Sequence, residues 1–249
     1  MFESQINLLS AFTSWWRRQC EERSKLAALH RLLALLCEFL RDSLPDRRRQ
    51  RYGDIEYDWE HRVNTTGAAL SWRTRLLGLL NSVYQPIPPE QFRQIMSALS
   101  AYLAPDTDFS QFTFIDIGAG KGRALLLASE FGFRRIIGIE LLPELVKIAR
   151  ENARVFQQRG MGSAIEVTCE DATNFVFPAE PAVIFLFNPL PESALRAFLE
   201  NLQSWLRQNS YPVYVIYANP IFEQAFRSIQ SLTKLSGTAQ CLLFRSSGG

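Results

Sequence analysis

Two acidic residues and three glycines have the types and the spacing to hold a small ligand. Asp116 ends a run of apolar and β-branched residues, and Gly118, Gly120 and Gly122 follow at every second position. Glu140 ends another short apolar run. Glycine allows backbone conformations and a close ligand approach that a Cβ would block, and a carboxylate at a strand tip can accept two hydrogen bonds from a ribose diol. These residues therefore predict a site for a nucleotide-type ligand.

A strand, a turn and a helix would position these residues. Residues 112–116 suit a strand that is buried on both faces, as a parallel sheet requires. The apolar run 124–128 begins a helix directly after the glycines, so its unpaired N–H groups would point into the crevice beyond the strand ends. Open α/β sheets bind ligands in that crevice. The alternative is a glycine turn that holds no ligand.

The glycine spacing disagrees with two other nucleotide-binding loops. A dinucleotide fingerprint would need its third glycine at position 123, where Arg123 stands. A phosphate loop would end in Gly-Lys-Ser/Thr, whereas Lys121 lies between two glycines. Over residues 84–245, the acidic-x-Gly-x-Gly-x-Gly pattern and the elements after it instead resemble the class I S-adenosylmethionine (AdoMet)-dependent methyltransferases.

Strands and helices alternate along the rest of the chain, which predicts a parallel sheet with both faces covered. The further strands are expected at residues 135–140, 164–168, 182–187, 212–217, 232–235 and 240–245, and the helices between them at 144–158 and 192–207. The resemblance implies a Rossmann-like α/β fold with a mostly parallel seven-stranded sheet, helices on both faces and a helical N-terminal extension. It also implies that the last two strands form an antiparallel hairpin at one edge.

The resemblance assigns roles in cofactor binding. Asp116 and the glycine turn would hold the methionine part of AdoMet, and Glu140 would bind the ribose hydroxyls. Asp171 with Ala172 would face the adenine, although Glu170 is an adjacent acidic candidate and Asp-Ala after a strand is also a common loop. The predicted cofactor-binding residues are Asp116, Gly118, Ala119, Gly120, Gly122, Glu140, Leu141, Asp171, Ala172 and Asn188.

Methyl transfer from a sulfonium needs little protein chemistry, because the enzyme mainly holds a nucleophile in line with an activated methyl group. Asn188 and Pro189 follow the strand at 182–187, and the Asn188 oxygen could orient an amine. This pair is similar to the Asn-Pro-Pro-aromatic motif of amino-group methyltransferases. Leu190 and Pro191 depart from that motif, and the missing aromatic disfavours a flipped nucleobase as acceptor. Alternatively, Asn-Pro merely starts a turn.

Two upstream segments are candidates for substrate or lid residues. Tyr84 and Pro86 belong to a Tyr-x-Pro-x-Pro stretch similar to one in some non-SET protein lysine methyltransferases, although a plain linker is the alternative. Asp58, Arg62 and Thr66 lie in an irregular stretch that is similar to a possible lid of small bacterial methyltransferases. A surface turn held by Asx-type hydrogen bonds accounts for the second stretch equally well.

The chain divides by composition into a helical N-terminal extension (1–50), a lid or cap (51–83) and an AdoMet-binding domain (84–249). Residues 26–40 are helical and apolar on one face, but too few and too charged to span a bilayer. The extreme N-terminus does not read as a secretory signal. We expect this helix to pack on the domain or on a partner, with membrane-surface attachment through residues 15–18 as a minor option.

Charge and cysteine content limit the kinds of partner and metal site that we expect for this chain. Net charge is +2, from 27 basic and 25 acidic side chains, so there is no strong case for nucleic acid. The basic run 47–51 is a solvated linker or a contact for an anionic partner. The four cysteines form no metal or redox motif, so we expect no bound metal and buried thiols in a reducing cytoplasm.

The sequence thus predicts a cytoplasmic AdoMet-dependent methyltransferase whose acceptor is a protein amine of the lysine type. One alternative is a small-molecule enzyme that methylates oxygen, nitrogen or carbon. Another is a non-catalytic scaffold subunit with the same fold, which acts or self-associates through its N-terminal helices.

Overall fold

The computed structural model describes residues 8–22, 24–42, 55–66, 85–158, 163–187 and 189–247. The described part of the chain divides into two compact units. Helices α1 (Leu8–Glu22) and α2 (Lys25–Asp42) lie in the first unit. Tyr57–Thr65 and Pro86–Gly249 make up the second.

The first unit contains two helices that pack against each other, and the helix expected at residues 26–40 corresponds to α2. Ser24 caps α2, because its side-chain oxygen accepts a hydrogen bond from the Ala27 amide at 3.3 Å. Trp15 of α1 and Ala28 of α2 are buried. Among the described residues, neither these helices nor any other is long and apolar enough to cross a bilayer.

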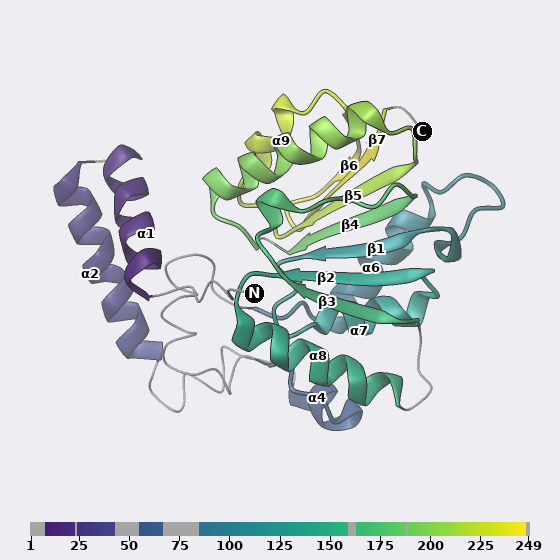
Figure 1. Cartoon of the computed structure of the whole chain (residues 1–249), viewed down its shortest axis with the longest axis horizontal. Helices are drawn as coiled ribbons and strands as arrows, with labels where there is room; N and C mark the ends of the chain where they lie inside the picture. Colours follow the sequence, from purple (N-terminus) through teal and green to yellow (C-terminus); the bar gives the residue numbers. More distant parts are fainter. Residues whose placement is uncertain are drawn as a thin grey trace. The chain divides into compact units, whose positions relative to one another are not determined.

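The second unit is built on a seven-stranded sheet in the order β3-β2-β1-β4-β5-β7-β6, as Figure 1 shows. The five strands on one side are parallel, whereas β7 runs antiparallel to both β5 and β6. The predicted sheet and its antiparallel edge hairpin are confirmed. The strands are β1 (Thr113–Ile117), β2 (Arg135–Glu140), β3 (Ile165–Cys169), β4 (Ala182–Phe187), β5 (Val213–Ala218), β6 (Leu232–Gly237) and β7 (Cys241–Ser246).

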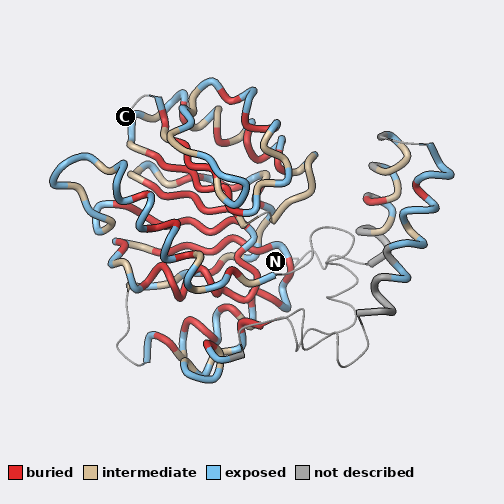
Figure 2. Tube along the Cα trace, turned by 180° about the vertical axis from the view of Figure 1, so that it is seen from behind, coloured by how far each residue is buried: buried red, intermediate tan, exposed pale blue. Residues whose placement is uncertain are grey.

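Helices cover both faces of this sheet, since alternate strand residues feed two separate cores. In β1, Phe114 belongs to the core under α6, α7 and α8, and Ile115 to the core under α9. Burial runs without a break along β5 and along β4 up to Leu186, as expected for strands covered on both faces (Figure 2). The helices are α6 (Pro89–Ser100), α7 (Arg123–Ala128), α8 (Pro143–Gln157) and α9 (Glu192–Gln208), with 3-10 turns at Phe109–Gln111, Ser129–Phe131, Ala172–Asn174 and Glu223–Ser228.

One stretch that the sequence predicted to be irregular contains a helix, α4 (Ile55–His61). Tyr57 and His61 lie one turn apart and stack with ring centroids 4.2 Å apart, and His61 continues the stack onto Phe156 of α8 at 5.8 Å. Tyr57 is buried in the α6–α7–α8 core. Short helices are held by tertiary packing rather than by propensity, which is why composition alone did not reveal this one.

The strand order fixes where ligand-binding groups can gather. β1 pairs with β2 on one side and β4 on the other, so successive crossovers diverge at this point. Asp116, the glycine turn and Glu140 therefore lie at the carboxyl-end edge of adjacent strands, with Pro189 beyond the end of β4. Open parallel sheets bind ligands at such a switch point.

Candidate functional site

The glycine turn between β1 and α7 has a left-handed backbone at three positions. Gly118, Gly120 and Gly122 have φ values of 72°, 57° and 85°. The amides of Gly118 and Ala119 both donate to the carbonyl of Ile139 in β2, at 2.8 and 2.9 Å. This pair of bonds fixes the start of the turn against the neighbouring strand.

Gly118 also brings the loop after β4 into contact with the glycine turn. A Cβ built on Gly118 would lie 2.3 Å from the Cβ of Pro189, so the position excludes any side chain. Of the predicted catalytic pair, Pro189 thus lies directly against the predicted cofactor turn. Asn188 lies outside the described residues.

Glu140 connects the tip of β2 to the same turn. Its side-chain oxygens accept hydrogen bonds from the amides of Gly120 and Leu142, both at 2.8 Å. The carboxyl is 7% exposed, and this burial raises its pKa, while the surrounding backbone amides oppose the rise. A carboxylate has about four lone-pair sites, so these two bonds leave capacity for a diol.

Asp116 is the second buried carboxyl of the site, with 3% of its surface exposed. Its carboxyl makes no hydrogen bond to the residues that the structure describes. Burial raises the pKa of Asp116 to about 8, and the charge of Glu140 adds to the rise. This pKa favours the protonated carboxyl at neutral pH, and a nearby cation would favour its ionised form.

The predicted adenine-side residues follow β3. The Asp171 carboxylate accepts from the amide and hydroxyl of Thr173, at 2.9 and 2.8 Å, and so caps the turn that begins at Ala172. Glu170 accepts from the hydroxyl of Thr168 at 2.7 Å. Ala172 is buried and Leu141, after β2, is 38% exposed. The local role of Asp171 is that of an Asx turn, and its second oxygen makes none of these contacts.

The predicted substrate and lid residues are dispersed. Pro86 is half-buried just before α6, whereas Tyr84 lies outside the described residues. Arg62 is exposed and has a φ of 52° in the turn that ends α4. Thr66, with 8% of its surface exposed, precedes residues 67–84, which the structure does not describe. Asp58 joins a buried polar cluster in the second unit.

Asp58 pairs with Arg123, the first residue of α7. The guanidinium is 2% exposed, lies 3.2 Å from Asp58 Oδ1 and donates to the Thr65 hydroxyl. It also lies over the ring of Tyr57, 4.3 Å from the centroid. Asp58 in turn accepts from the amide of Thr65 at 2.8 Å and from its hydroxyl. The arginine that breaks the dinucleotide fingerprint is therefore a buried ion-pair partner.

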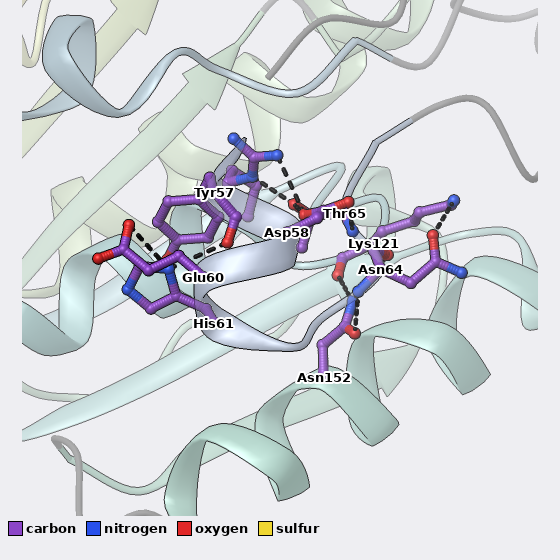
Figure 3. A network of polar contacts seen from close by, with 9 residues as sticks. Tyr57, Asp58, Glu60, His61, Asn64, Thr65, Lys121 and Asn152 are labelled. Atoms are coloured by element: carbon purple, nitrogen blue, oxygen red, sulfur yellow. Dashed lines mark hydrogen bonds and ion pairs between the residues drawn. The ribbon is translucent and has the colours of Figure 1, made fainter. Parts of the chain in front are cut away.

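Lys121, which precedes Gly122 in the chain, also contacts the segment that follows α4 (Figure 3). The Lys121 ammonium donates to the side chain of Asn64 at 2.8 Å. The Asn152 amide of α8 accepts from the Asn64 amide at 2.8 Å and donates to the carbonyls of Asn64 and Lys121, both at 2.9 Å. Burial lowers the pKa of Lys121 to about 8, and the charge of Asp58 opposes this effect.

Sequence reasoning missed these contacts, although a signal was present. Leu145, Ala149, Asn152 and Phe156 share the buried stripe of α8. A single asparagine on an apolar stripe indicates a buried amide that needs partners. Arg123 at the start of the apolar run 124–128 is a similar signal, because a buried guanidinium requires an acceptor.

A family model described as a methyltransferase domain matches residues 114–209, from β1 to the end of α9. Among curated proteins, the ribosomal protein L11 methyltransferases of Clostridium perfringens strains SM101 and 13 are each 38% identical over 63 residues. These alignments cover 25% of this chain and 18% of those proteins. The chain thus spans less than one fifth of the length of the curated relatives it matches.

Two solved structures are similar to part of this chain. Magnesium protoporphyrin IX methyltransferase from Synechocystis, with bound SAM, is 13% identical and has a TM-score of 0.46, over 64% of this chain and 79% of that one. The ribosomal protein L11 methylase from Lactobacillus delbrueckii subsp. bulgaricus is 19% identical with a TM-score of 0.43, over the same shares of the two chains.

Proposed function

We propose that this chain, of which residues 114–209 match a methyltransferase-domain model, transfers the methyl group of AdoMet to an amine on a protein, of the lysine type. The observation that carries the proposal is the gathering of Asp116, the glycine turn and Glu140 at the switch point of the sheet, inside the matched region. Methyltransferases of this class use AdoMet as methyl donor.

The residues present suit that cofactor. AdoMet carries positive charge on its sulfonium and on its amino group, and the site offers two buried carboxyls. Asp116 and the turn from Gly118 to Gly122 would hold the methionine part, and Glu140 would accept from the ribose hydroxyls. Leu141, Asp171 and Ala172 would flank the adenine. AdoMet supplies an activated methyl group, so these residues need only bind and orient it.

The acceptor is argued from the loop after β4. Pro189 packs against Gly118, so the loop borders the turn that would hold methionine. Asn188, proposed from sequence, would accept a hydrogen bond from the amine and direct its lone pair toward the methyl group. The curated relatives are named for methylating a ribosomal protein, which supports a protein acceptor. We further propose that the reaction takes place in the cytoplasm.

Calorimetric titration tests the cofactor proposal. We expect AdoMet and S-adenosylhomocysteine to bind with micromolar affinity, on the order of −8 kcal/mol, and NAD to give no heat. Asp116→Ala should abolish binding. An intact protein that binds neither AdoMet nor its demethylated product would contradict the proposal and favour the scaffold alternative.

Transfer of a labelled methyl group into cell extract tests the acceptor. Label should enter protein, and Asn188→Ala should reduce transfer while leaving AdoMet affinity unchanged. Label that enters only small molecules would move the function to the small-molecule alternative. Full activity of Asn188→Ala on the true acceptor would remove that residue from the mechanism.

A further inference from the structure

The glycine turn is held from two sides. On one side, Glu140 accepts from the Gly120 amide. On the other, Lys121 and Arg123 flank Gly122 and both extend to the segment Tyr57–Thr65, which we call the brace. The predicted cofactor turn is thus in contact with a segment that lies far from it in the sequence.

The brace is docked by buried, directional contacts. Arg123 is 2% exposed and meets three brace groups: the Asp58 carboxylate, the Thr65 hydroxyl and the Tyr57 ring. A buried guanidinium strongly favours keeping its carboxylate partner, because separation would leave an unpaired buried charge. The buried ion pair therefore favours the docked position of the brace.

Asn152 joins the brace to the turn itself. Its amide is 3% exposed and bonds both backbone groups of Asn64, in the manner of a neighbouring strand. The same NH2 group donates to the carbonyl of Lys121, between Gly120 and Gly122. One side chain therefore fixes the brace backbone and the turn backbone relative to each other.

We propose that the brace is a fixed element that positions the glycine turn for its ligand, and that Asn152 is the positioning residue that couples them. The contacts that dock this segment are made to protein groups, the buried Arg123 guanidinium, the Lys121 ammonium and the Asn152 amide, as expected for a fixed element rather than a lid. Coupling is reciprocal, so ligand held by the turn also stabilises the docked brace. The identity of the ligand rests on the proposed function, but the coupling between brace and turn does not.

The test compares three variants by hydrogen exchange and AdoMet calorimetry. Asn152→Asp keeps the acceptor and the size of the side chain but loses both donated bonds. Asn64→Ala, at an exposed side chain, removes only the Lys121 contact and leaves the backbone bonds to Asn152. Glu151→Gln changes the neighbouring exposed residue, whose side chain pairs with Arg154, and serves as the matched control.

We expect the amides of Val63, Asn64 and Thr65 to be protected in the wild-type protein without ligand, because each donates within the docked brace. Asn152→Asp should speed exchange in the brace and at residues 118–122 and weaken AdoMet binding about tenfold. Asn64→Ala should produce the same pattern more weakly, and Glu151→Gln should match the wild type. Saturating AdoMet should restore brace protection in Asn152→Asp. General destabilisation would instead speed exchange across the whole sheet, including β4 and β5.

Two results would overturn the inference. One is brace amides that exchange at the rate of an unstructured peptide in the ligand-free wild-type protein. The other is fast brace exchange in Asn152→Asp with residues 118–122 unaffected. A wild-type protein that binds no AdoMet would overturn the proposed function instead, and exchange at residues 118–122 would still decide whether the brace and turn are coupled.

Discussion

At the scale of single residues, the site contains two buried carboxyls in different states. Glu140 is hydrogen-bonded by backbone amides, whereas Asp116 makes no such bond to the described residues. Burial, and then the charge of Glu140, raises the pKa of Asp116 to about 8. A cation that binds beside Asp116 would therefore displace the proton that this carboxyl holds.

This exchange predicts how AdoMet affinity depends on pH. A cationic ligand favours ionised Asp116, so binding below pH 8 releases a proton. We expect affinity to rise with pH between about 6 and 8, by at most about tenfold per pH unit, and then to level off. Calorimetry in two buffers of different ionisation enthalpy measures the released proton. Affinity that falls as pH rises through this window would contradict the assignment.

The same shift predicts the stability of Asp116→Asn. The folded-state pKa of Asp116 lies above its unfolded value of 3.8, so the folded protein binds the extra proton and stability falls as pH rises from about 4 to 8. The pKa of Lys121 is lowered from 10.5 to about 8, so its own effect on the pH dependence of stability lies above this window. The melting temperature of Asp116→Asn should therefore exceed that of the wild type by a margin that grows from pH 5 to pH 8. A margin that shrinks would show that burial does not penalise the carboxylate.

At the scale of elements, comparing Gly118 with Gly132 distinguishes the cost of a left-handed backbone from the cost of a steric clash. Gly118 and Gly132 both have a φ of 72°, but a Cβ at Gly132 meets nothing within 4 Å, and one at Gly118 meets Pro189. We expect Gly132→Ala to cost about 1 kcal/mol of unfolding free energy, from the left-handed backbone alone. Gly118→Ala should cost about 1–3 kcal/mol more, because the loop after β4 must move.

Denaturant unfolding measures both costs, and AdoMet titration gives the functional difference. Gly132→Ala should bind AdoMet as the wild type does, whereas Gly118→Ala should lose most of its affinity. Equal effects of the two substitutions on affinity would mean that contact between the glycine turn and Pro189 is unimportant for binding.

The individual elements also show which parts of the fold and of the site could be predicted from the sequence. The strands were predictable because a central parallel strand is a continuous apolar run, as in β4 and β5. Asp116, the glycines and Glu140 were recognisable because they follow such runs directly. α4 was not, since its stability comes from Tyr57 packing into a core built by distant residues. Contacts such as Asn64 with Asn152 depend on tertiary docking, which local pattern does not encode.

At the scale of the whole molecule, the two compact units suggest separable roles. The ion pair of Asp58 with Arg123 and the hydrogen bonds of Asn64 to Lys121 and Asn152 lie within the second unit. The first unit contains α1 and α2, and α2 exposes Leu26, Leu29, Leu33 and Leu36 along its length. Exposed leucines of this kind are typical of surfaces that contact another protein.

Deletion of residues 1–45 tests this separation, because it removes both described helices and leaves the brace intact. We expect the shortened protein to bind AdoMet with a dissociation constant within about twofold of the full chain, a difference of roughly 0.4 kcal/mol. A second deletion, of residues 1–66, also removes the brace and should weaken binding about tenfold or more. If the shorter deletion folds but loses AdoMet, residues 1–45 are needed for cofactor binding. If it keeps AdoMet but loses methyl transfer to protein, the N-terminal helices select the acceptor, because the chemistry of the turn would still be in place.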